Sequence, residues 1–381
     1  MKIIKYKYSD IDEPGWSFDE VCFGDVNLLV GLSASGKTRL LRTIFNLGAF
    51  TVRQDYLKNF KNGHWNLEFE QRGKKYNWEI ITKRISATAS LIAKETLYEN
   101  SKLIIERDED KFIFEDKKIP KLPLQQTSIY LLKETECIMP IYDGFSLIMR
   151  RNFFGNTLKE QAENTLITPE ASEEFKVAAD QGKQNFLSKL YKSGLPVGAR
   201  LYFLENHFKE DYRIITDYLK SIFPFIENIL FLDITKFEPN YPIKGKMPIL
   251  CIKEKHVNKW IPYKELSSGM QKVILFLTDI KTFPEGSIYL IDEYENSLGI
   301  NAINIFPSFL SEVEQDIQFF ITSHHPYLIN NIGVKNWYVL HRKGSNVKFL
   351  YGEKNIERFG KSKQKAFVQL LNDSFYREGI E

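Results

Sequence analysis

The chain has 381 residues, of which 43% are apolar and 27% are charged. These figures exclude a disordered or fibrous chain and are typical of a soluble protein with one large or two modest domains. Lysine and arginine number 52 and aspartate and glutamate 49, so the net charge of +3 does not by itself indicate a nucleic-acid partner. The charge is uneven, because residues 335–381 hold ten basic and five acidic side chains.

The cysteines and the lack of long apolar runs predict a cytoplasmic protein. Cys22, Cys137 and Cys251 lie far apart, without a CxxC pair or a histidine at metal-ligand spacing, so we expect neither a disulfide framework nor a structural zinc site. The N-terminus lacks the apolar core of a signal peptide, and no apolar run approaches the roughly 18 residues of a membrane span.

In chain order, the first 30 residues read as strands, and the apolar run that ends at Val30 is followed by a turn and a helix. Residues 65–114 alternate between apolar and polar, which predicts antiparallel hairpins. Between about Ser172 and Phe223 the apolar spacing becomes helical. Strands resume at ILFLDI and PILCIK, and after Lys264 strands and helices alternate, which indicates a mainly parallel sheet covered by helices.

The segment Gly31–Thr38 matches the pattern G-x-x-x-x-G-K-[ST] between an apolar strand and the helical run RLLRTI. Its glycines allow the backbone N–H groups and the positive end of the helix to converge on phosphate oxygens. In such a loop Lys37 reaches the β- and γ-phosphates and Thr38 ligates Mg²⁺. The alternative is a glycine-rich turn that only ends a strand.

Two further strand ends carry polar side chains. The apolar run Ile288–Ile291 ends in Asp292 and Glu293, which in a phosphate site serve to hold Mg²⁺ and to polarise the attacking water. The run FFITS is followed by His324, which at the carboxyl end of a strand is placed to contact a γ-phosphate or the attacking water. The alternatives are an ordinary charged strand end and a surface histidine.

The sequence ELSSGMQK opens an apolar run that needs burial, with Ser267 or Ser268 as the helix N-cap. A helix start with serine and glycine offers N–H and hydroxyl donors to an anion, although an isolated feature of this kind is more often only a cap. Its position about 20 residues before the carboxylates favours the anion-binding interpretation.

In this order the motifs resemble those of the ATP-binding-cassette (ABC) ATPase superfamily. The resemblance identifies Gly31–Thr38 as Walker A, Leu266–Met270 as the signature, Asp292 and Glu293 as the end of Walker B, Ser297-Leu298-Gly299 as the D-loop and His324 as the H-loop. It implies Glu293, His324 and Lys37 as catalytic residues and Thr38 and Asp292 as Mg²⁺ ligands. The implied ATP-binding residues are Gly31, Ser33, Ala34, Ser35, Gly36, Lys37, Thr38, Arg39, Ser267, Ser268 and Gly269, with Gln125 or Gln126 as a candidate Q-loop.

Leu266 lies 228 positions after Thr38, a far longer gap than in transporter subunits, and this gap resembles the RecF, SMC and OLD-type branch. The phrases LSSGMQK, IDEYENSLG and ITSHHPYLIN are similar to stand-alone ATPases of bacterial anti-phage operons, such as the Septu, PARIS and retron-associated ATPases. Two departures stand out. Ser33-Ala34 replaces the usual Asn-Gly of Walker A, and the signature reads LSSGM rather than LSGGQ.

Together these features predict an α/β fold: a P-loop NTPase core of the ABC type with a mainly parallel sheet, an antiparallel β subdomain and a helical insertion. The expected divisions are an N-terminal ATPase lobe at 1–150, a helical insertion at 151–225 and a C-terminal ATPase lobe at 226–381.

The resemblance implies a homodimer that sandwiches ATP and Mg²⁺, because in the superfamily the signature of one subunit completes the site of another. The first functional hypothesis is a regulatory ATPase of a defence system that controls a separate effector such as a nuclease. The second is a RecF-like repair protein whose basic side chains bind DNA phosphates, namely Lys335, Arg342, Lys343, Lys348, Lys361, Lys363 and Lys365. A transporter subunit is the third and least favoured interpretation.

Overall fold

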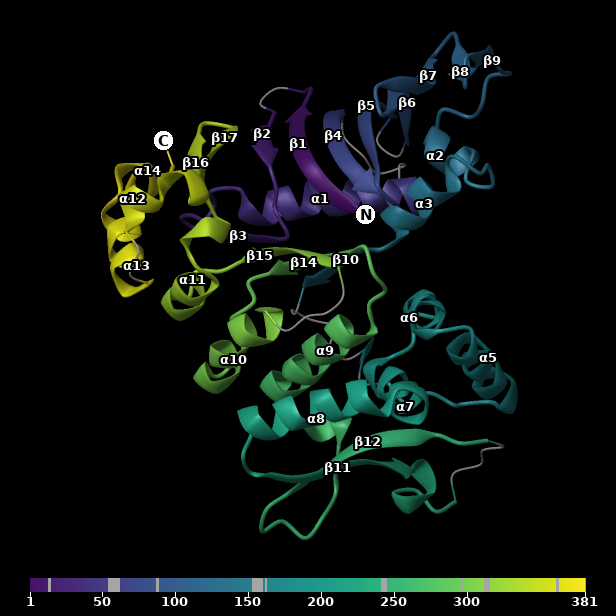
Figure 1. Ribbon diagram of the computed structural model, residues 1–381, viewed down its shortest axis with the longest axis vertical. Coiled ribbons are helices and arrows are strands. Elements are labelled where there is room, and N and C mark those ends of the chain that lie inside the picture. The colour runs from purple at the N-terminus through teal and green to yellow at the C-terminus, as the bar shows by residue number, and fades with distance from the viewer. Residues whose placement is uncertain are drawn as a thin grey trace. The chain divides into compact units, whose positions relative to one another are not determined.

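The computed structural model describes residues 1–12, 15–53, 62–86, 89–152, 160–161, 163–240, 245–296, 298–311, 316–360 and 363–380 (Figure 1). The chain forms two compact units. The first contains Met1–Arg151, Gly286–Tyr294 and Ile317–Glu381, and the second contains Asn152–Glu285 and Glu295–Asp316. Among the described residues, the helices are all too short or too polar to cross a membrane.

The first unit is built on one large sheet, which has 14 strands within the described residues. The spatial order is β10-β14-β15-β3-β16-β17-β2-β1-β4-β5-β6-β7-β8-β9. The strands are β1 (Lys2–Asp10), β2 (Ser17–Cys22), β3 (Val26–Val30), β4 (Gly63–Gln71), β5 (Lys74–Ser86), β6 (Ala89–Glu99), β7 (Lys102–Asp108), β8 (Phe112–Phe114), β9 (Lys117–Lys118), β10 (Ile148–Asn152), β14 (Ser287–Asp292), β15 (Ile317–Thr322), β16 (Trp337–Lys343) and β17 (Asn346–Tyr351).

Four neighbouring strands, β14, β15, β3 and β16, are parallel and form the centre of this unit. Every residue of β14 and β15 is buried, as expected for parallel strands that are covered on both faces. Their register pairs Ile291 with Ile321 and Ile321 with Leu28, so the three strands end at the same edge of the sheet. The polar residues that follow these strands are therefore brought together.

The antiparallel extension, β4 to β9, carries the alternating pattern found in the sequence. In β4 buried residues alternate with partly exposed ones, and the buried face includes Trp65, Leu67 and Phe69. This face belongs to one hydrophobic core with residues of α1 (Lys37–Val52), among them Leu41 and Ile44. Helix α1 thus has its hydrophobic stripe buried in the core of the first unit, and its first turn lies where the parallel strands end (Figure 1).

The remaining helices of the first unit flank the sheet. Helices α2 (Ser128–Leu131) and α3 (Met139–Ser146) contact α1. After β15 the chain forms α11 (Pro326–Ile332), α12 (Ile356–Phe359), α13 (Lys363–Asn372) and α14 (Ser374–Arg377), in which α13 contacts α11, α12 and α14.

The second unit combines helices with a small antiparallel sheet. Its helices are α5 (Pro169–Asp180), α6 (Lys183–Lys192), α7 (Val197–His207), α8 (Lys209–Ile222), α9 (Ser268–Thr282) and α10 (Ile300–Ser311). The strands β11 (Ile226–Asp233), β12 (Pro248–Glu254) and β13 (Ile261–Pro262) form the sheet. Helix α9 is buried on every side from Met270 to Thr282, and its Asp279 receives a 2.8 Å hydrogen bond from the buried guanidinium of Arg200 on α7.

The two units differ from the three segments expected from the sequence. Residues 226–285 pack with the helices of 152–225, because β12 contacts α7 and α9 contacts α7 and α8. Residues 286–294 and 317–381 instead extend the large sheet through β14 to β17. Strand pairing between distant segments decides this division, and a strand-helix pattern along the chain does not reveal it.

Candidate functional site

The site begins at the loop that connects β3 to α1. Gly36 is the N-cap of α1 and has a φ of +106°, in the region that favours glycine. A Cβ atom at this position would lie 3.1 Å from Trp16 Cζ3 and 3.2 Å from Val347 Cγ2. The predicted loop therefore has a glycine where the backbone and its surroundings both require one.

We expect Gly36→Ala to lower the free energy of unfolding by about 2 kcal/mol, because the new methyl group adds crowding to backbone strain. Gly73→Ala is the matched control, since Gly73 also has a positive φ of 75° but has nothing within 4 Å of its Cβ position. Urea denaturation followed by circular dichroism measures both variants. Equal losses would contradict the tight packing of the loop against Trp16.

Lys37 is the first residue of α1 and is buried. Its Nζ donates hydrogen bonds to the carbonyl oxygens of Gly31 at 2.9 Å and Leu32 at 2.8 Å. The first turn of α1, which the structure describes completely, contains no acidic residue and no capping side chain. Its N–H groups, the helix dipole and the lysine therefore all favour an anion at this position.

The departure from Asn-Gly in this loop has a local cost. Ala34 has a φ of +65°, a conformation that costs a residue with a side chain roughly 1 kcal/mol. Arg342 Nη1 donates a 2.9 Å hydrogen bond to the Ala34 carbonyl oxygen and so helps to hold this conformation. The loop thus contains no glycine at position 34, and a hydrogen bond from an arginine of β16 supports its conformation.

Asp292, the last residue of β14, is the centre of a polar network. Its Oδ1 accepts hydrogen bonds from the hydroxyl groups of Thr38 and Thr322, both at 3.0 Å. Its Oδ2 lies 3.0 Å from Nη2 of Arg150. The Thr322 hydroxyl also accepts a 2.7 Å hydrogen bond from the backbone N–H of Glu293, so one threonine links both carboxylate residues.

The donor set of Thr38 and Asp292 fits a magnesium ion, which prefers oxygen ligands and takes the rest from phosphates and water. Within the described residues there is no group of three or more His, Cys, Asp or Glu that could hold a metal. A site made of one carboxylate and one hydroxyl at a phosphate loop therefore suits Mg²⁺ bound together with a nucleotide better than a metal held by protein ligands alone.

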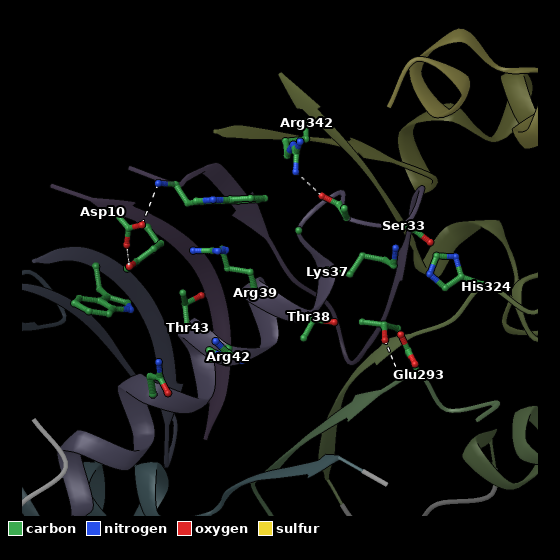
Figure 2. A pocket seen from close by; sticks show the side chains of 17 residues that line it. Asp10, Ser33, Lys37, Thr38, Arg39, Arg42, Thr43, Glu293, His324 and Arg342 are labelled. Carbon is green, nitrogen blue, oxygen red and sulfur yellow. Dashed lines mark hydrogen bonds between the residues drawn. The ribbon is translucent and has the colours of Figure 1, made fainter. Parts of the chain in front are cut away.

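Glu293 follows Asp292 with a φ of +50°, which is uncommon for a residue with a side chain. The hydrogen bond of its N–H to Thr322 supports this conformation. Backbone strain of this kind often occurs at functional sites. Figure 2 shows Glu293 and His324 beside Lys37 and Thr38, at one end of the pocket.

These residues line a cavity of about 740 Å³ in the first unit. Eight of the predicted site residues line it: Ser33, Ala34, Gly36, Lys37, Thr38, Arg39, Glu293 and His324. Gly31 and Ser35 are buried in the loop, and Asp292 contacts Thr38. The lining includes four cationic side chains, of Lys37, Arg39, Arg42 and Arg342, against the carboxylates of Asp10 and Glu293, which favours an anionic ligand.

The sequence interpretation missed half of this cavity. The further lining residues are Tyr8, Asp10, Trp16, Arg42, Thr43, Asn46, Trp65, Thr322 and Arg342. Trp16 is the most distinctive, because its ring contacts two guanidinium groups, with Arg39 Cζ at 4.2 Å and Arg342 Cζ at 5.1 Å from the ring centroid. In the sequence, the only sign of this aromatic contact is a tryptophan that precedes the phosphate loop.

Asp10 fixes the start of the turn that carries Trp16. Its Oδ2 accepts a 3.0 Å hydrogen bond from the Trp16 N–H, and its Oδ1 accepts one from the Tyr8 hydroxyl. Burial, together with this carboxylate, raises the pKa of Tyr8 well above its usual value, so that its hydroxyl stays a donor.

The candidate signature lies in the second unit. Ser267 is the N-cap of α9, and its hydroxyl accepts a 3.3 Å hydrogen bond from the Met270 N–H. Of the two serines predicted as the N-cap, Ser267 and Ser268, the structure thus has the first. Ser267 and Ser268 are exposed, and Gly269 is half-buried. In the candidate D-loop, Ser297 lies outside the described residues, whereas the Gly299 carbonyl oxygen accepts a 3.0 Å hydrogen bond from the Ala302 N–H.

Neither Gln125 nor Gln126 lines the cavity, all of whose lining residues lie in the described part of the chain. Gln126 lies before α2, and its carbonyl oxygen accepts a 3.0 Å hydrogen bond from Nη1 of Arg107. Arg107 is itself buried beside Glu95, at 3.5 Å. This pair connects the segment of Gln126 to the antiparallel part of the sheet. The side chain beside Asp292 is instead Arg150 of β10.

The basic residues near the C-terminus differ in their surroundings. Arg342 lines the cavity, whereas Lys335, Lys343 and Lys348 are exposed. Lys343 and Lys348 lie on the paired strands β16 and β17. Lys361 lies outside the described residues, as do the side chains of Lys363 and Lys365.

Comparison with solved structures defines the fold as that of an SMC head, a P-loop ATPase fold, and confirms the predicted fold class. An SMC head bound to the C-winged helix domain of ScpA matches with a TM-score of 0.55 and 12% identity, over 94% of this chain and 100% of that chain. The SMC head domain from Thermotoga maritima is also similar, with a TM-score of 0.44 and 12% identity, over 92% of this chain and 99% of that chain. A third match is an Smc head with an extended coiled coil, bound to the C-terminal domain of ScpA derived from Pyrococcus furiosus. It has a TM-score of 0.48 and 12% identity, over 93% of this chain and 98% of that chain.

The sequence itself matches one family model, described as "AAA domain, putative AbiEii toxin, Type IV TA system", over residues 183–330. This segment includes the candidate signature and the residues Asp292, Glu293 and His324, but not the phosphate loop. No curated protein matches the chain.

Proposed function

We propose that this chain binds ATP with Mg²⁺ and hydrolyses it in the manner of an ABC-type ATPase. The observation that carries the proposal is the 3.0 Å contact between the Thr38 hydroxyl and Asp292 beside the cavity that Lys37 and Glu293 line. It brings a phosphate loop and a strand-end carboxylate together from positions 254 residues apart. The fold of an SMC head supports the same conclusion.

In this proposal Lys37 exchanges its two carbonyl partners for oxygens of the β- and γ-phosphates, which the N–H groups at the start of α1 also bind. Thr38 and Asp292 hold Mg²⁺, which when bound neutralises charge that develops on the phosphates. Glu293 accepts a proton from the attacking water as its oxygen bonds to the γ-phosphorus and the bond to the leaving ADP oxygen breaks. His324 donates a hydrogen bond to the transferred phosphate.

The cationic aromatic cluster of Trp16, Arg39 and Arg342 gives the other end of the ligand a place. The faces of nucleobases stack on indole rings and guanidinium planes, and a positive environment suits the α-phosphate. We assign this part of the cavity to the ribose and the base.

We also propose a homodimer, which the exposed start of α9 supports. This helix start is distant from the phosphate loop in the sequence. The hydroxyl groups of Ser267 and Ser268, with the N–H groups beside them, offer donors to the γ-phosphate bound by a second copy. ATP would then favour the closed pair, and hydrolysis would open it.

Sedimentation velocity of the Glu293→Gln variant tests this dimer. We expect a monomer without nucleotide and a dimer with ATP and Mg²⁺, because the variant retains ATP. Adding Ser268→Glu should restore the monomer, since a carboxylate would face a phosphate. A particle of the same mass in all three samples would contradict the sandwich.

We further propose that the dimer is the regulatory ATPase of a bacterial anti-phage system and switches a partner effector such as a nuclease in the cytoplasm. The motif phrases around Ser267, Asp292 and His324 support this role, and so does the family model, whose description names a toxin of a toxin–antitoxin system. The related SMC heads bind ScpA domains, which shows that a head of this fold can carry a protein partner.

The alternative is a DNA-binding repair or chromosome-maintenance ATPase, which the exposed lysines Lys335, Lys343 and Lys348 favour. Titration of a fluorescent duplex between 50 and 200 mM salt separates the two roles. Affinity that falls by roughly a thousandfold over this range would support the repair role. Absent or salt-insensitive binding would support the protein-partner role.

A further inference from the structure

Arg150 holds an unusual position beside the candidate Mg²⁺ ligand. It belongs to β10, the neighbour of β14 in the sheet, and its Nη2 lies 3.0 Å from Asp292 Oδ2. The side chains of Arg150 and Asp292 are only 15% and 7% exposed. Within the described residues the buried Nε of Arg150 has no hydrogen-bond partner, so Asp292 is the main polar contact that the guanidinium makes.

With this pair, both oxygens of the Asp292 carboxylate have partners before any metal binds. Oδ1 accepts two hydroxyl groups and Oδ2 faces the guanidinium, which also balances the negative charge. A buried carboxylate without a cation is unfavourable, because it loses its hydration and gains no opposite charge. Removal of one partner of a buried ion pair leaves the other as such an unpaired charge. A divalent ion at Asp292 therefore meets a carboxylate whose charge the guanidinium already balances.

We propose that Arg150 is the resident cation of Asp292 and competes with Mg²⁺ for it. The competition keeps the metal from binding to the empty protein. When a nucleotide brings phosphate oxygens as additional ligands, the metal gains enough to displace the arginine. This inference rests on the proposed function for its nucleotide step, but the competition itself concerns only the metal and two residues of this chain.

The test measures Mn²⁺ binding to the nucleotide-free full-length chain through the electron paramagnetic resonance signal of the free ion. We expect Arg150→Met to lower the Kd for Mn²⁺ by about tenfold, because Asp292 then lacks a competing cation. Arg150→Gln keeps a hydrogen-bond donor without the charge and should show the same decrease, so the inference stays testable if one variant folds poorly. Arg151→Met is the matched control, since alternation places its side chain on the opposite face of the strand, and should leave the Kd unchanged.

An unchanged or higher Kd for Mn²⁺ in either folded variant would overturn the inference. A second arm adds a non-hydrolysed ATP analogue, with which the wild-type chain should bind Mn²⁺ tightly and the difference between wild type and Arg150→Met should shrink. If the wild-type chain binds no nucleotide in this arm, the proposed function fails, while the nucleotide-free comparison still decides whether Arg150 competes with the metal.

Discussion

Replacement of Lys37 by methionine should weaken ATP binding by about a hundredfold. The lysine is buried at the start of α1, and its Nζ already faces the loop carbonyls of Gly31 and Leu32. Methionine keeps the length of the side chain but removes both the charge and the hydrogen bonds that the phosphates would receive. Titration with a fluorescent ATP analogue in Mg²⁺ measures the loss.

The matched control for this prediction is Lys348→Met, which removes an exposed lysine of β17. It should bind ATP as the wild-type chain does. Thermal melting of both variants separates lost binding from lost folding. If Lys37→Met binds ATP within threefold of the wild type, the loop around Lys37 is not the phosphate site.

Replacement of Glu293 by glutamine should slow ATP hydrolysis by about 10²- to 10⁴-fold, as expected for the loss of a general base. Glutamine can keep the backbone N–H bond to Thr322 and the same shape, so ATP affinity should change little. Phosphate release in single-turnover conditions measures the rate, and equilibrium titration measures the affinity.

Glu285→Gln makes the same chemical change at an exposed position outside the cavity and serves as the control. It should hydrolyse ATP at the wild-type rate. A decrease of less than tenfold in Glu293→Gln would show that another group takes the proton, and Glu293 would then have only a positioning role.

Much of the candidate site could be predicted because its polar residues belong to short contiguous motifs. The loop that ends in Lys37 and Thr38 lies between an apolar strand and a helix, and Asp292 and His324 follow apolar runs. Parallel strands bring their carboxyl ends to one edge, so knowledge of each strand end is enough to place these residues near one another. The antiparallel hairpins of β4 to β7 followed from simple alternation in the same way.

The rest depends on pairings between distant segments. Trp16 and Arg342 meet because β17 pairs with β2 and β16 with β3, which no local pattern reveals. Arg150 reaches Asp292 because β10 lies beside β14 in the sheet. The two residues are 142 positions apart in the sequence, so no local pattern links them. A Q-loop is expected to carry a glutamine, so an arginine on an edge strand gives no signal in the sequence.

The most direct test of the account is a structure of the chain with Mg²⁺ and a non-hydrolysed ATP analogue. We predict the triphosphate in the loop of Gly31–Thr38, with Lys37 Nζ within about 3 Å of its β- and γ-oxygens and the base beside Trp16. Nucleotide bound elsewhere, or a map in which the loop stays closed over Lys37 at saturating ligand, would contradict it.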